Sequence, residues 1–342
     1  MATIDDVART AGVSKSTVSN VFSQKRPISK EVTDKVLAAA RQLNYKPNYW
    51  ARSLANKTTR IIGLNMPAEK VKFSHFHLSL LNGVLNECNS HGYRLLVNTL
   101  SIDFLNQVPQ ISSEPVDGDI LLDPAEDDER IADRLQQGLP LVVVGRPPAK
   151  FEAKVSYVDN DNVGIAEQVT HYLLTLGHRR ILFLNAARKR TVGVDRECGY
   201  RMALETAGVP VDPARVVYKE NPFGSSTEFG YATTKEMLAR DPTITAVITD
   251  TDKVALGVYR AAAEMNIGIP ERLSVFAFSD DSVFAPEFSP PLTGVKLHAE
   301  QLGREAAGLL IEQCATGRRT VKRVIVPTDI AIRGSCGPAR DA

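Results

Sequence analysis

Apolar residues recur at helical spacing in the opening segment of the chain. Thr3, with Asp6 three residues later, has the pattern of a capping box at a helix start, and Gly12 suits a left-handed helix end. The apolar face of this first helix consists of Ile4, Val7, Ala8 and Ala11. Ser14 then caps a second helix, whose apolar face consists of Val18, Val21 and Phe22. Two short helices joined by a tight turn that contains glycine form a helix-turn-helix.

A third helix is expected after Pro27 and Ser29, and it should end at Asn44, before Pro47. This helix is scaffold, because its apolar stripe consists of Val32, Val36, Leu37, Ala40 and Leu43. The second helix instead presents short polar side chains, which suit phosphates and base edges in a major groove. These side chains are Lys15, Ser16, Thr17, Ser19 and Asn20. The alternative is an ordinary solvated helix surface.

From residue 60 onward, short apolar runs alternate with helical patterns, which indicates repeated strand and helix units with parallel sheets. The runs expected as strands are residues 61–64, 93–97, 119–122, 141–144, 181–184, 246–248 and 275–278. About 280 residues is too long for one open sheet, and residues 142–148 make a pause near the middle. We therefore expect two doubly wound lobes, with a ligand in the cleft between them at the carboxyl ends of the strands.

The composition, 43% hydrophobic and 24% charged, is typical of a soluble chain of two or three domains. The first residues are acidic where a signal peptide needs a basic flank, and no run of eighteen apolar residues occurs. We therefore expect a cytoplasmic protein. Metal-ligand spacing is lacking, so we expect reduced thiols and neither a metal nor another cofactor. The cysteines are Cys88, Cys198, Cys314 and Cys336.

The net charge of +1 hides two parts of opposite sign. Residues 1–60 contain 11 Lys and Arg against 4 Asp and Glu, a balance of +7. Residues 61–342 contain 30 against 36, a balance of −6. A basic head on an acidic body is typical of a chain whose head contacts a polyanion, although a solvated basic surface gives the same count.

Residues 4–19 read Ile-Asp-Asp-Val-Ala-Arg-Thr-Ala-Gly-Val-Ser-Lys-Ser-Thr-Val-Ser, and they resemble the opening of the LacI/GalR family of bacterial transcription regulators. Residues 44–48, 51–54 and 59–63 resemble that family's hinge helix, which is too short to be stable without DNA and a second copy. In the family, the leucine at the position of Leu54 wedges into the minor groove; an ordinary linker residue is the alternative. The resemblance implies DNA contacts from Thr3, Ser14, Lys15, Ser16, Thr17, Ser19, Asn20, Asn48, Ala51, Arg52 and Leu54.

The rest of the chain resembles the same family, whose core is similar to periplasmic sugar-binding proteins. The segments that carry this resemblance are residues 172–181, 196–200, 252–257, 290–293 and 333–335. It implies an α/β two-lobe core of doubly wound parallel sheets behind an all-α helix-turn-helix head. The chain should cross between lobes three times, the helix near 299–316 returning to the first lobe and the last strand, 323–332, to the second. The expected divisions are a head at 1–47, a hinge at 48–59 and a core at 60–337, with a first lobe at about 60–160 and 292–321 and a second at about 161–291 and 322–337.

The resemblance also implies effector contacts in the cleft. Arg196 matches the family's ligand-contacting arginine, whose planar fork suits paired hydroxyls or a carboxylate; a surface ion pair is the alternative. Thr251 and Asp252 lie where the family has a polar contact. Phe223 resembles an aromatic over the ligand, although its spacing to the next glycine is unusual. Ser279 replaces an aspartate that often grips the ligand, which argues against carrying over a particular sugar.

Other residues near strand ends are further effector candidates. Two imidazoles after the first strand either bind a polar ligand or simply begin a helix, in a stretch that contains His75, Phe76 and His77. Asp123 ends its strand at the same mouth, and the register of a repeated Asp-Asn pair favours Asp161 with Asn162. The basic residues 188–190 either meet a phosphate or carboxylate or form a solvated loop.

These features favour a sequence-specific transcription regulator, a repressor that binds a pseudo-palindromic operator in the nucleoid as a homodimer. A small effector in the cleft, a sugar or a sugar derivative, is expected to control its affinity for DNA. Only seven residues follow Ser335, which favours a dimer over the family's tetramers with a leucine-heptad tail. The alternatives are a cytoplasmic small-molecule binding protein without regulatory DNA binding, and an enzyme, although no catalytic motif occurs in the sequence.

Overall fold

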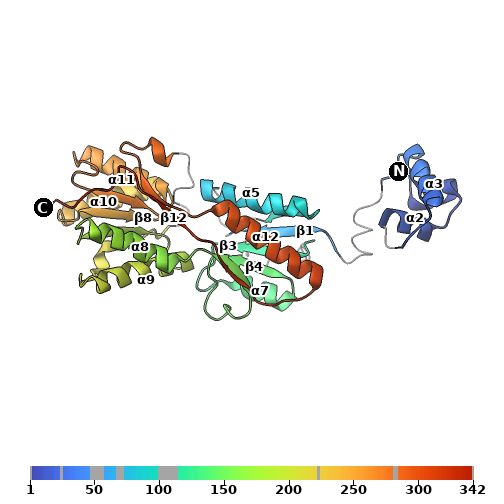
Figure 1. The fold of residues 1–342 in the computed structure, drawn as a ribbon, viewed down its shortest axis with the longest axis horizontal. Helices are drawn as coiled ribbons and strands as arrows, with labels where there is room; N and C mark the ends of the chain where they lie inside the picture. Colours follow the sequence, from blue (N-terminus) through green and yellow to red (C-terminus); the bar gives the residue numbers. More distant parts are fainter. Residues whose placement is uncertain are drawn as a thin grey trace. The chain divides into compact units, whose positions relative to one another are not determined.

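The computed structural model describes residues 2–23, 26–46, 58–66, 73–98, 115–221, 224–279 and 284–340. The chain divides into two compact units, Met1–Arg60 and Ile61–Ala342. Figure 1 shows the fold of each. No helix within the described ranges is long and apolar enough to cross a membrane.

The first unit is a small helical domain in which local caps fix the helix ends. Its described helices are α1 (Ile4–Ala11), α2 (Lys15–Ser23) and α3 (Lys30–Gln42). Thr3 and Asp6 form the expected capping box, and Gly12 ends α1 in the left-handed conformation with φ 65°. Ser29 caps α3, and this helix ends at Gln42, slightly earlier than expected. The predicted helix-turn-helix is confirmed. Its buried core consists of Val7, Ala8, Val18, Val21, Val36, Ala39 and Ala40.

Within the described residues, the second unit contains two six-stranded sheets. The first sheet has the order β11-β5-β4-β3-β1-β2, with parallel pairing. Its strands are β1 (Ile61–Asn65), β2 (Arg94–Asn98), β3 (Gly118–Leu122), β4 (Leu141–Val144), β5 (Ser156–Asp159) and β11 (Arg323–Ile325). α5 (His75–Ser90) and α12 (Ala299–Thr316) cover one face and α7 (Glu129–Gln137) the other (Figure 1). The apolar runs follow from burial on both faces.

The second sheet has the order β12-β10-β9-β8-β6-β7, and only its β10–β12 pair is antiparallel among the pairings described. Its strands are β6 (Ile181–Asn185), β7 (Val216–Tyr218), β8 (Ala246–Thr249), β9 (Ser274–Ala277), β10 (Thr293–Lys296) and β12 (Asp329–Ala331). α8 (Asn162–Thr175) and α9 (Thr191–Thr206) cover one face, and α10 (Ser226–Arg240) and α11 (Asp252–Glu264) the other (Figure 1). Two short 3-10 helices are η2 (Pro213–Arg215) and η3 (Ala285–Glu287). The predicted two-lobe α/β core is confirmed.

The chain passes between the two sheets after β5, between β10 and α12, and between β11 and β12. Two expected lobe boundaries were wrong. Residues 293–296, expected in the first lobe, form β10 of the second sheet. Residues 323–332 are not one strand of the second lobe, because β11 pairs with β5 in the first sheet and β12 with β10 in the second. Pro327, which cannot donate to a sheet, lies between them and separates the two strands.

Buried polar groups join the segments that cross between the sheets. The side-chain amide of Asn160 donates to the carbonyl oxygens of Leu297 at 3.1 Å and Val326 at 3.0 Å. The Val326 amide in turn donates to the Asp159 carbonyl at 2.8 Å. Asn160 therefore holds the crossing segments against one another, and this arrangement fixes where the carboxyl ends of the strands meet.

Candidate functional site

Part of the polar surface at the start of α2 is used by the fold itself. Ser14 Oγ accepts a hydrogen bond from the Thr17 amide at 3.1 Å and lies 2.9 Å from Thr17 Oγ1. Thr3 Oγ1 accepts one from the Asp6 amide at 3.3 Å. These candidate DNA contacts therefore shape helix starts in the free protein, and each keeps an exposed or half-buried oxygen.

The remaining candidates on α2 face solvent. Lys15, Ser16 and Ser19 are exposed, and Asn20 is half-buried. Lys15 Nζ lies 3.0 Å from Asp5 Oδ2, with side chains 61% and 57% exposed. Such an exposed ion pair contributes little and is readily exchanged for a phosphate. Outside the described residues lie the remaining DNA candidates Asn48, Ala51, Arg52 and Leu54.

In the second unit, charged and polar side chains gather where the carboxyl ends of the two sheets' strands meet. We call this cluster the interlobe site, and it comprises His77, Asp123, Asp159, Asn162, Arg196 and Asp250. The charges act on one another across it: Asp159 is influenced by Arg196, and Asp250 by Asp123. The site therefore draws on both lobes, as the parallel topology predicts.

Arg196 is the centre of the second lobe's contribution. Its side chain is 5% exposed, and Nη1 donates to Asp250 Oδ1 at 2.8 Å. Nε donates to Asn162 Oδ1 at 3.1 Å, and the guanidinium carbon lies 4.5 Å from the ring centroid of Phe278. Burial lowers the pKa of Arg196, against the attraction of Asp250. Burial also raises the pKa of Asp250, which Arg196 opposes. The surface ion pair considered for this arginine is thus a buried one.

Asp159 is buried at the end of β5, beside Arg196. Its Oδ1 accepts hydrogen bonds from the Asn160 amide at 2.8 Å and from Asn162 Nδ2 at 3.0 Å. Burial raises the pKa of Asp159 to about 7; the bond from Asn160 opposes this shift and the charge of Asp195 adds to it. The sequence did not single out Asp159 as the member of the repeated Asp-Asn pair that acts here, although it lies at a strand end like the other candidates.

The first lobe contributes Asp123 and His77. A backbone amide can only donate, so the contact of 3.2 Å from the Ser74 amide makes His77 Nδ1 an acceptor and leaves the proton on Nε2. Nε2–H then faces Asp123 Oδ2 at 3.3 Å. Burial would raise the pKa of Asp123, but His77 and the cations Arg190 and Arg130 outweigh it and lower this pKa to about 2. His77 therefore completes the capping box at the start of α5 and also contacts the ionised carboxylate of Asp123.

Several effector candidates have local structural roles. Thr251 caps α11 through a bond from the Val254 amide, and the Asp252 carboxylate accepts from the Lys253 amide at 2.8 Å. Asp161 is exposed and caps α8, so Asn162 rather than Asp161 reaches Arg196. The structure describes no contact of these three residues with the interlobe site.

The other candidates are placed as follows. His75 Nδ1 lies 3.4 Å from Ser79 Oγ on the same helix. Phe76 packs against the hydrophobic cores of both lobes, which makes it a contact between lobes. Ser279 is half-buried just after β9. Phe223 lies outside the described residues. Asp250, which sequence reasoning missed, directly follows β8 and precedes the candidate Thr251, so strand-end position was the available signal.

The basic residues 188–190 are engaged by the protein itself. Arg188 lies over the ring of Tyr218, with its guanidinium carbon 4.1 Å from the centroid. Lys189 Nζ lies 2.8 Å from Asp127 Oδ2, and Arg190 Nη1 donates to the Asp123 carbonyl. Each of the three basic side chains therefore has a partner within the protein.

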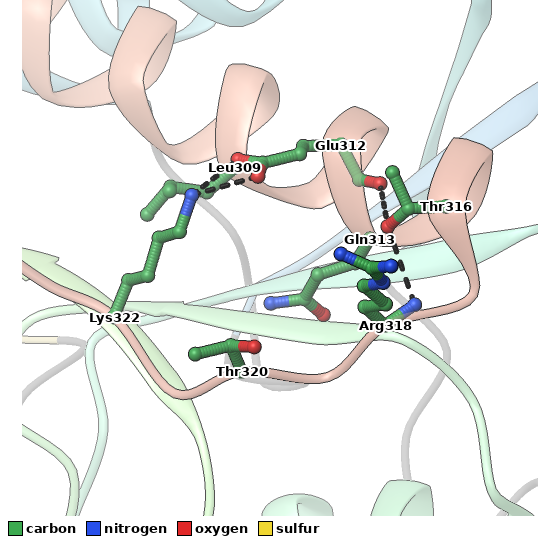
Figure 2. A pocket seen from close by; sticks show the side chains of 7 residues that line it. All are labelled: Leu309, Glu312, Gln313, Thr316, Arg318, Thr320 and Lys322. Carbon is green, nitrogen blue, oxygen red and sulfur yellow. Dashed lines mark hydrogen bonds and ion pairs between the residues drawn. The ribbon is translucent and has the colours of Figure 1, made fainter.

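A pocket of about 170 Å³ lies elsewhere, between the end of α12 and the segment that leads into β11. Lys322 Nζ pairs with Glu312 across its opening, at 2.6 and 2.7 Å from the two carboxylate oxygens, as Figure 2 shows. The described effector candidates are not among its lining residues, which are Leu309, Glu312, Gln313, Thr316, Arg318, Thr320 and Lys322. This pocket is thus separate from the interlobe site.

A helix-turn-helix head suits a DNA major groove, and a two-lobed α/β core suits a small ligand at its strand ends, so the architecture is that of a DNA-binding protein with a ligand-binding body. Comparison with known families agrees: residues 3–48 match the model of bacterial regulatory proteins of the lacI family, and residues 170–336 match a periplasmic binding protein-like domain. The chain is 32% identical over 337 residues to the HTH-type transcriptional regulator CelR of Thermobifida fusca, covering 97% of this chain and 98% of that protein. It therefore belongs to the LacI family, and it is a DNA-binding transcription regulator.

Further relatives and solved structures agree. The HTH-type transcriptional repressor PurR of Haemophilus influenzae is 30% identical over 344 residues, which cover 98% of both chains. A solved CelR–cellobiose complex superposes with a TM-score of 0.75 at 30% identity and covers 98% of this chain and 100% of that one. A lac repressor dimer bound to operator and the anti-inducer ONPF has a TM-score of 0.82, with 24% identity and 98% coverage of both chains, and it shows the shared fold. These relatives are named as regulators, and not as solute-binding proteins or enzymes, which were the two alternative functions considered for the sequence.

Proposed function

We propose that this regulator is a repressor, that it binds a pseudo-palindromic operator as a homodimer, and that an uncharged sugar at the interlobe site sets its affinity for DNA. The observation that carries the proposal is the pairing of Arg196 with Asp250 and Asn162 next to the Asp123–His77 pair. The relatives named as repressors support the direction of regulation. The proposal includes the DNA contacts that the family resemblance implies for the head.

The exposed polar face of α2 supports the operator-binding part of the proposal. Lys15, Ser16 and Ser19 are exposed on one short helix, which reaches only a few base pairs. Two copies related by a twofold axis would place two such helices in successive major grooves, so a pseudo-palindromic site is needed for useful specificity.

An apolar face of the first lobe supports a homodimer. On α5, Leu78 and Leu85 are 49% and 44% exposed, and they lie one heptad apart on the same side of the helix. On the side of the sheet that α5 covers, the neighbouring edge strand β2 exposes Val97 at 36%. A second copy of this chain is the occupant that we propose, because a twofold interface buries the same face on both partners.

The chemistry of the interlobe site supports an uncharged, hydroxyl-rich effector. Carboxylate and amide oxygens accept hydrogen bonds from hydroxyls, and a guanidinium edge donates them in pairs. The charges of Arg196 and Asp250 offset each other, and Asp123 is matched by His77 and by neighbouring cations. A phosphate or carboxylate would instead need a cation without a carboxylate partner. The CelR–cellobiose complex is a relative with such a sugar bound.

Operator binding is tested first. Duplexes selected by the purified full-length protein from a random pool are titrated at two salt concentrations, each as an intact site and as one half-site. We expect steep salt dependence and an affinity for the intact site that exceeds the half-site affinity by at least about 10³-fold. Equal affinity for the half-site would contradict binding as a symmetric pair.

The effector class is tested separately by calorimetry and thermal shift with cellobiose, other uncharged disaccharides and monosaccharides, and their phosphorylated or acidic forms. A sugar at a hundred times its dissociation constant should stabilise the folded protein by about 2.7 kcal/mol. Tighter binding of a phosphorylated or acidic form than of its uncharged parent would contradict the proposed class. The matched variants are Arg196→Lys, which keeps the charge but loses the planar fork, and Arg201→Lys on the solvent side of the same helix.

A further inference from the structure

The two lobes are joined directly through their backbones on one side of the interlobe site. Ala125, in the loop after β3, forms an antiparallel bridge with Arg190, in the loop after β6. The Glu126 amide donates to the Lys189 carbonyl at 2.9 Å, and the Thr191 amide donates to the Pro124 carbonyl at 3.2 Å. These bonds hold the first lobe against the start of α9, the helix that carries Arg196.

Arg146 makes a largely buried side-chain contact across this junction. It follows β4 in the first lobe, and its Nε donates to both carboxylate oxygens of Asp195 on α9, each at 2.9 Å. Its Nη2 donates to Glu126 Oε1 at 3.0 Å. The side chains of Arg146 and Asp195 are only 23% and 12% exposed, so solvent weakens this pair much less than an exposed one.

Asp195 directly precedes Arg196, and both side chains are buried on α9. The carboxylates of Asp159, Asp195 and Asp250 all act on Arg196. Arg146, which comes from the opposite lobe, pairs with Asp195 and so offsets one of these charges. The electrostatic balance around the effector-contacting arginine therefore depends on whether the two lobes are together.

We propose that Arg146 is a positioning residue: by pairing with Asp195 it holds the lobes together and keeps Arg196 directed at Asp250 and Asn162. When the lobes separate, Asp195 loses its partner, and Arg196 is drawn toward the unpaired Asp195 carboxylate instead. The contact thus links lobe closure to the geometry of the interlobe site. Its consequence for sugar binding rests on the proposed function, whereas its effect on the lobes does not.

The same junction contains a matched control pair. Lys189 Nζ lies 2.8 Å from Asp127 Oδ2, and this ion pair also crosses between the lobes. Its side chains are 79% and 65% exposed, so water already screens the attraction. Removal of Lys189 deletes the same charge from the same junction and should leave the lobes as they are.

The test measures the distance between the lobes in the full-length protein without DNA or sugar. Cys198 is exposed on α9, while burial raises the pKa of the Cys88 thiol to about 11 and of the Cys314 and Cys336 thiols to about 12. One spin label is attached to Cys198 and a second to an Ala153→Cys variant at an exposed first-lobe position. Labelled chains are diluted with unlabelled protein so that only distances within one chain are recorded.

We expect Arg146→Gln to lengthen and broaden the distance distribution, with the ratio of joined to separated lobes falling about tenfold or more. Lys189→Gln should match the parent, and Arg146→Lys should fall between the parent and Arg146→Gln. A distribution of Arg146→Gln that superimposes on the parent would overturn the proposal. Affinity for cellobiose should fall by the same factor as the joined population, and failure of that part alone would count against the proposed effector.

Discussion

At the scale of single residues, the interlobe site holds ionisable side chains in a buried environment that disfavours their charged forms. Arg196 is buried and offset by Asp250, and Asp123 is ionised because His77 and nearby cations outweigh its burial. Asp159 is the exception, since burial raises its pKa to about 7. Such groups are costly for folding unless they are fully partnered, which makes them candidates for function rather than for stability.

The raised pKa of Asp159 predicts a pH-dependent stability. The folded state holds this proton more tightly than an ordinary Asp of pKa 3.8, so the folded protein loses stability as pH rises from about 4 through 7. Asp159→Asn keeps the acceptor oxygen and removes the charge, and at pH 8 it should raise the free energy of unfolding by about 1–3 kcal/mol. The gain should shrink toward pH 5 in urea melts. Asp161→Asn, at an exposed cap nearby, is the control, and a gain for Asp159→Asn that does not change with pH would contradict the assignment.

Lys15 supports a second prediction at this scale. It is exposed on α2, so Lys15→Gln should weaken operator binding and reduce the slope of log affinity against log salt by about 1. Lys35 on α3 has a similarly exposed ion pair with Glu31, on the helix that we interpret as scaffold. Lys35→Gln should therefore leave the slope nearly unchanged in the same titration. Equal losses for the two variants would mean that the head contributes only diffuse charge.

At the scale of elements, close helix packing sets the shape of each lobe. α5 and α12 lie side by side (Figure 1), and a Cβ on Gly303 would stand 2.1 Å from the Leu80 carbonyl oxygen. A Cβ on Gly83 would stand 1.9 Å from the Glu300 carbonyl oxygen. These backbones approach so closely that any side chain at the two glycines would force the helices apart.

Gly303→Ala should therefore destabilise the first lobe by about 1–3 kcal/mol or more, because a methyl group meets backbone that cannot move aside alone. Gly308 lies on the same helix, and a Cβ there would meet only Glu87 Oε1 at 3.6 Å, which is ordinary contact. Gly308→Ala should instead stabilise by roughly 0.5–1 kcal/mol through helix propensity. Chemical denaturation of both variants measures this contrast, and a Gly303→Ala variant as stable as Gly308→Ala would refute the packing argument.

The sequence predicted elements well where local rules decide them. Thr3, Gly12 and Ser29 act at helix ends as their types require, and each long apolar run overlaps a strand. The short strands β5, β7 and β10 were missed, because none of them is a run of four apolar residues. The division of residues 323–332 between two sheets depends on tertiary pairing, and only Pro327 hinted at it.

The site was predictable as a place but not as a set of contacts. Strand-end position pointed to Asp123 and the family resemblance to Arg196, and both lie in the interlobe site; strand-end position would also have found Asp250. Which member of the repeated Asp-Asn pair reaches Arg196 depends on a one-residue register between strand and helix, and Asn162 rather than Asp161 does so. The pairing of Arg146 with Asp195 joins residues 49 positions apart, and no local pattern reveals it.

At the scale of the whole molecule, a basic head and an acidic core divide the work of contacting DNA and sensing a ligand. The head carries +7 and the remainder −6, so the core is repelled by the polyanion that the head attracts. A ligand can change operator affinity only if it binds differently to the joined and the separated lobes. We propose that the Arg146–Asp195 contact is made only when the lobes are joined, while the segments held by Asn160 connect the two lobes.

The central claim is tested most directly by measuring the operator affinity of the full-length protein with and without a saturating sugar. The sugar used is the uncharged one that stabilises the folded protein most. The coupling free energy expected between two such sites is about 1–3 kcal/mol, so the dissociation constant for the selected duplex should change by about 5–150-fold. Arg146→Gln should reduce that change, and Lys189→Gln should preserve it. An operator affinity that stays the same when the interlobe site is filled would contradict the central claim that this site controls DNA binding.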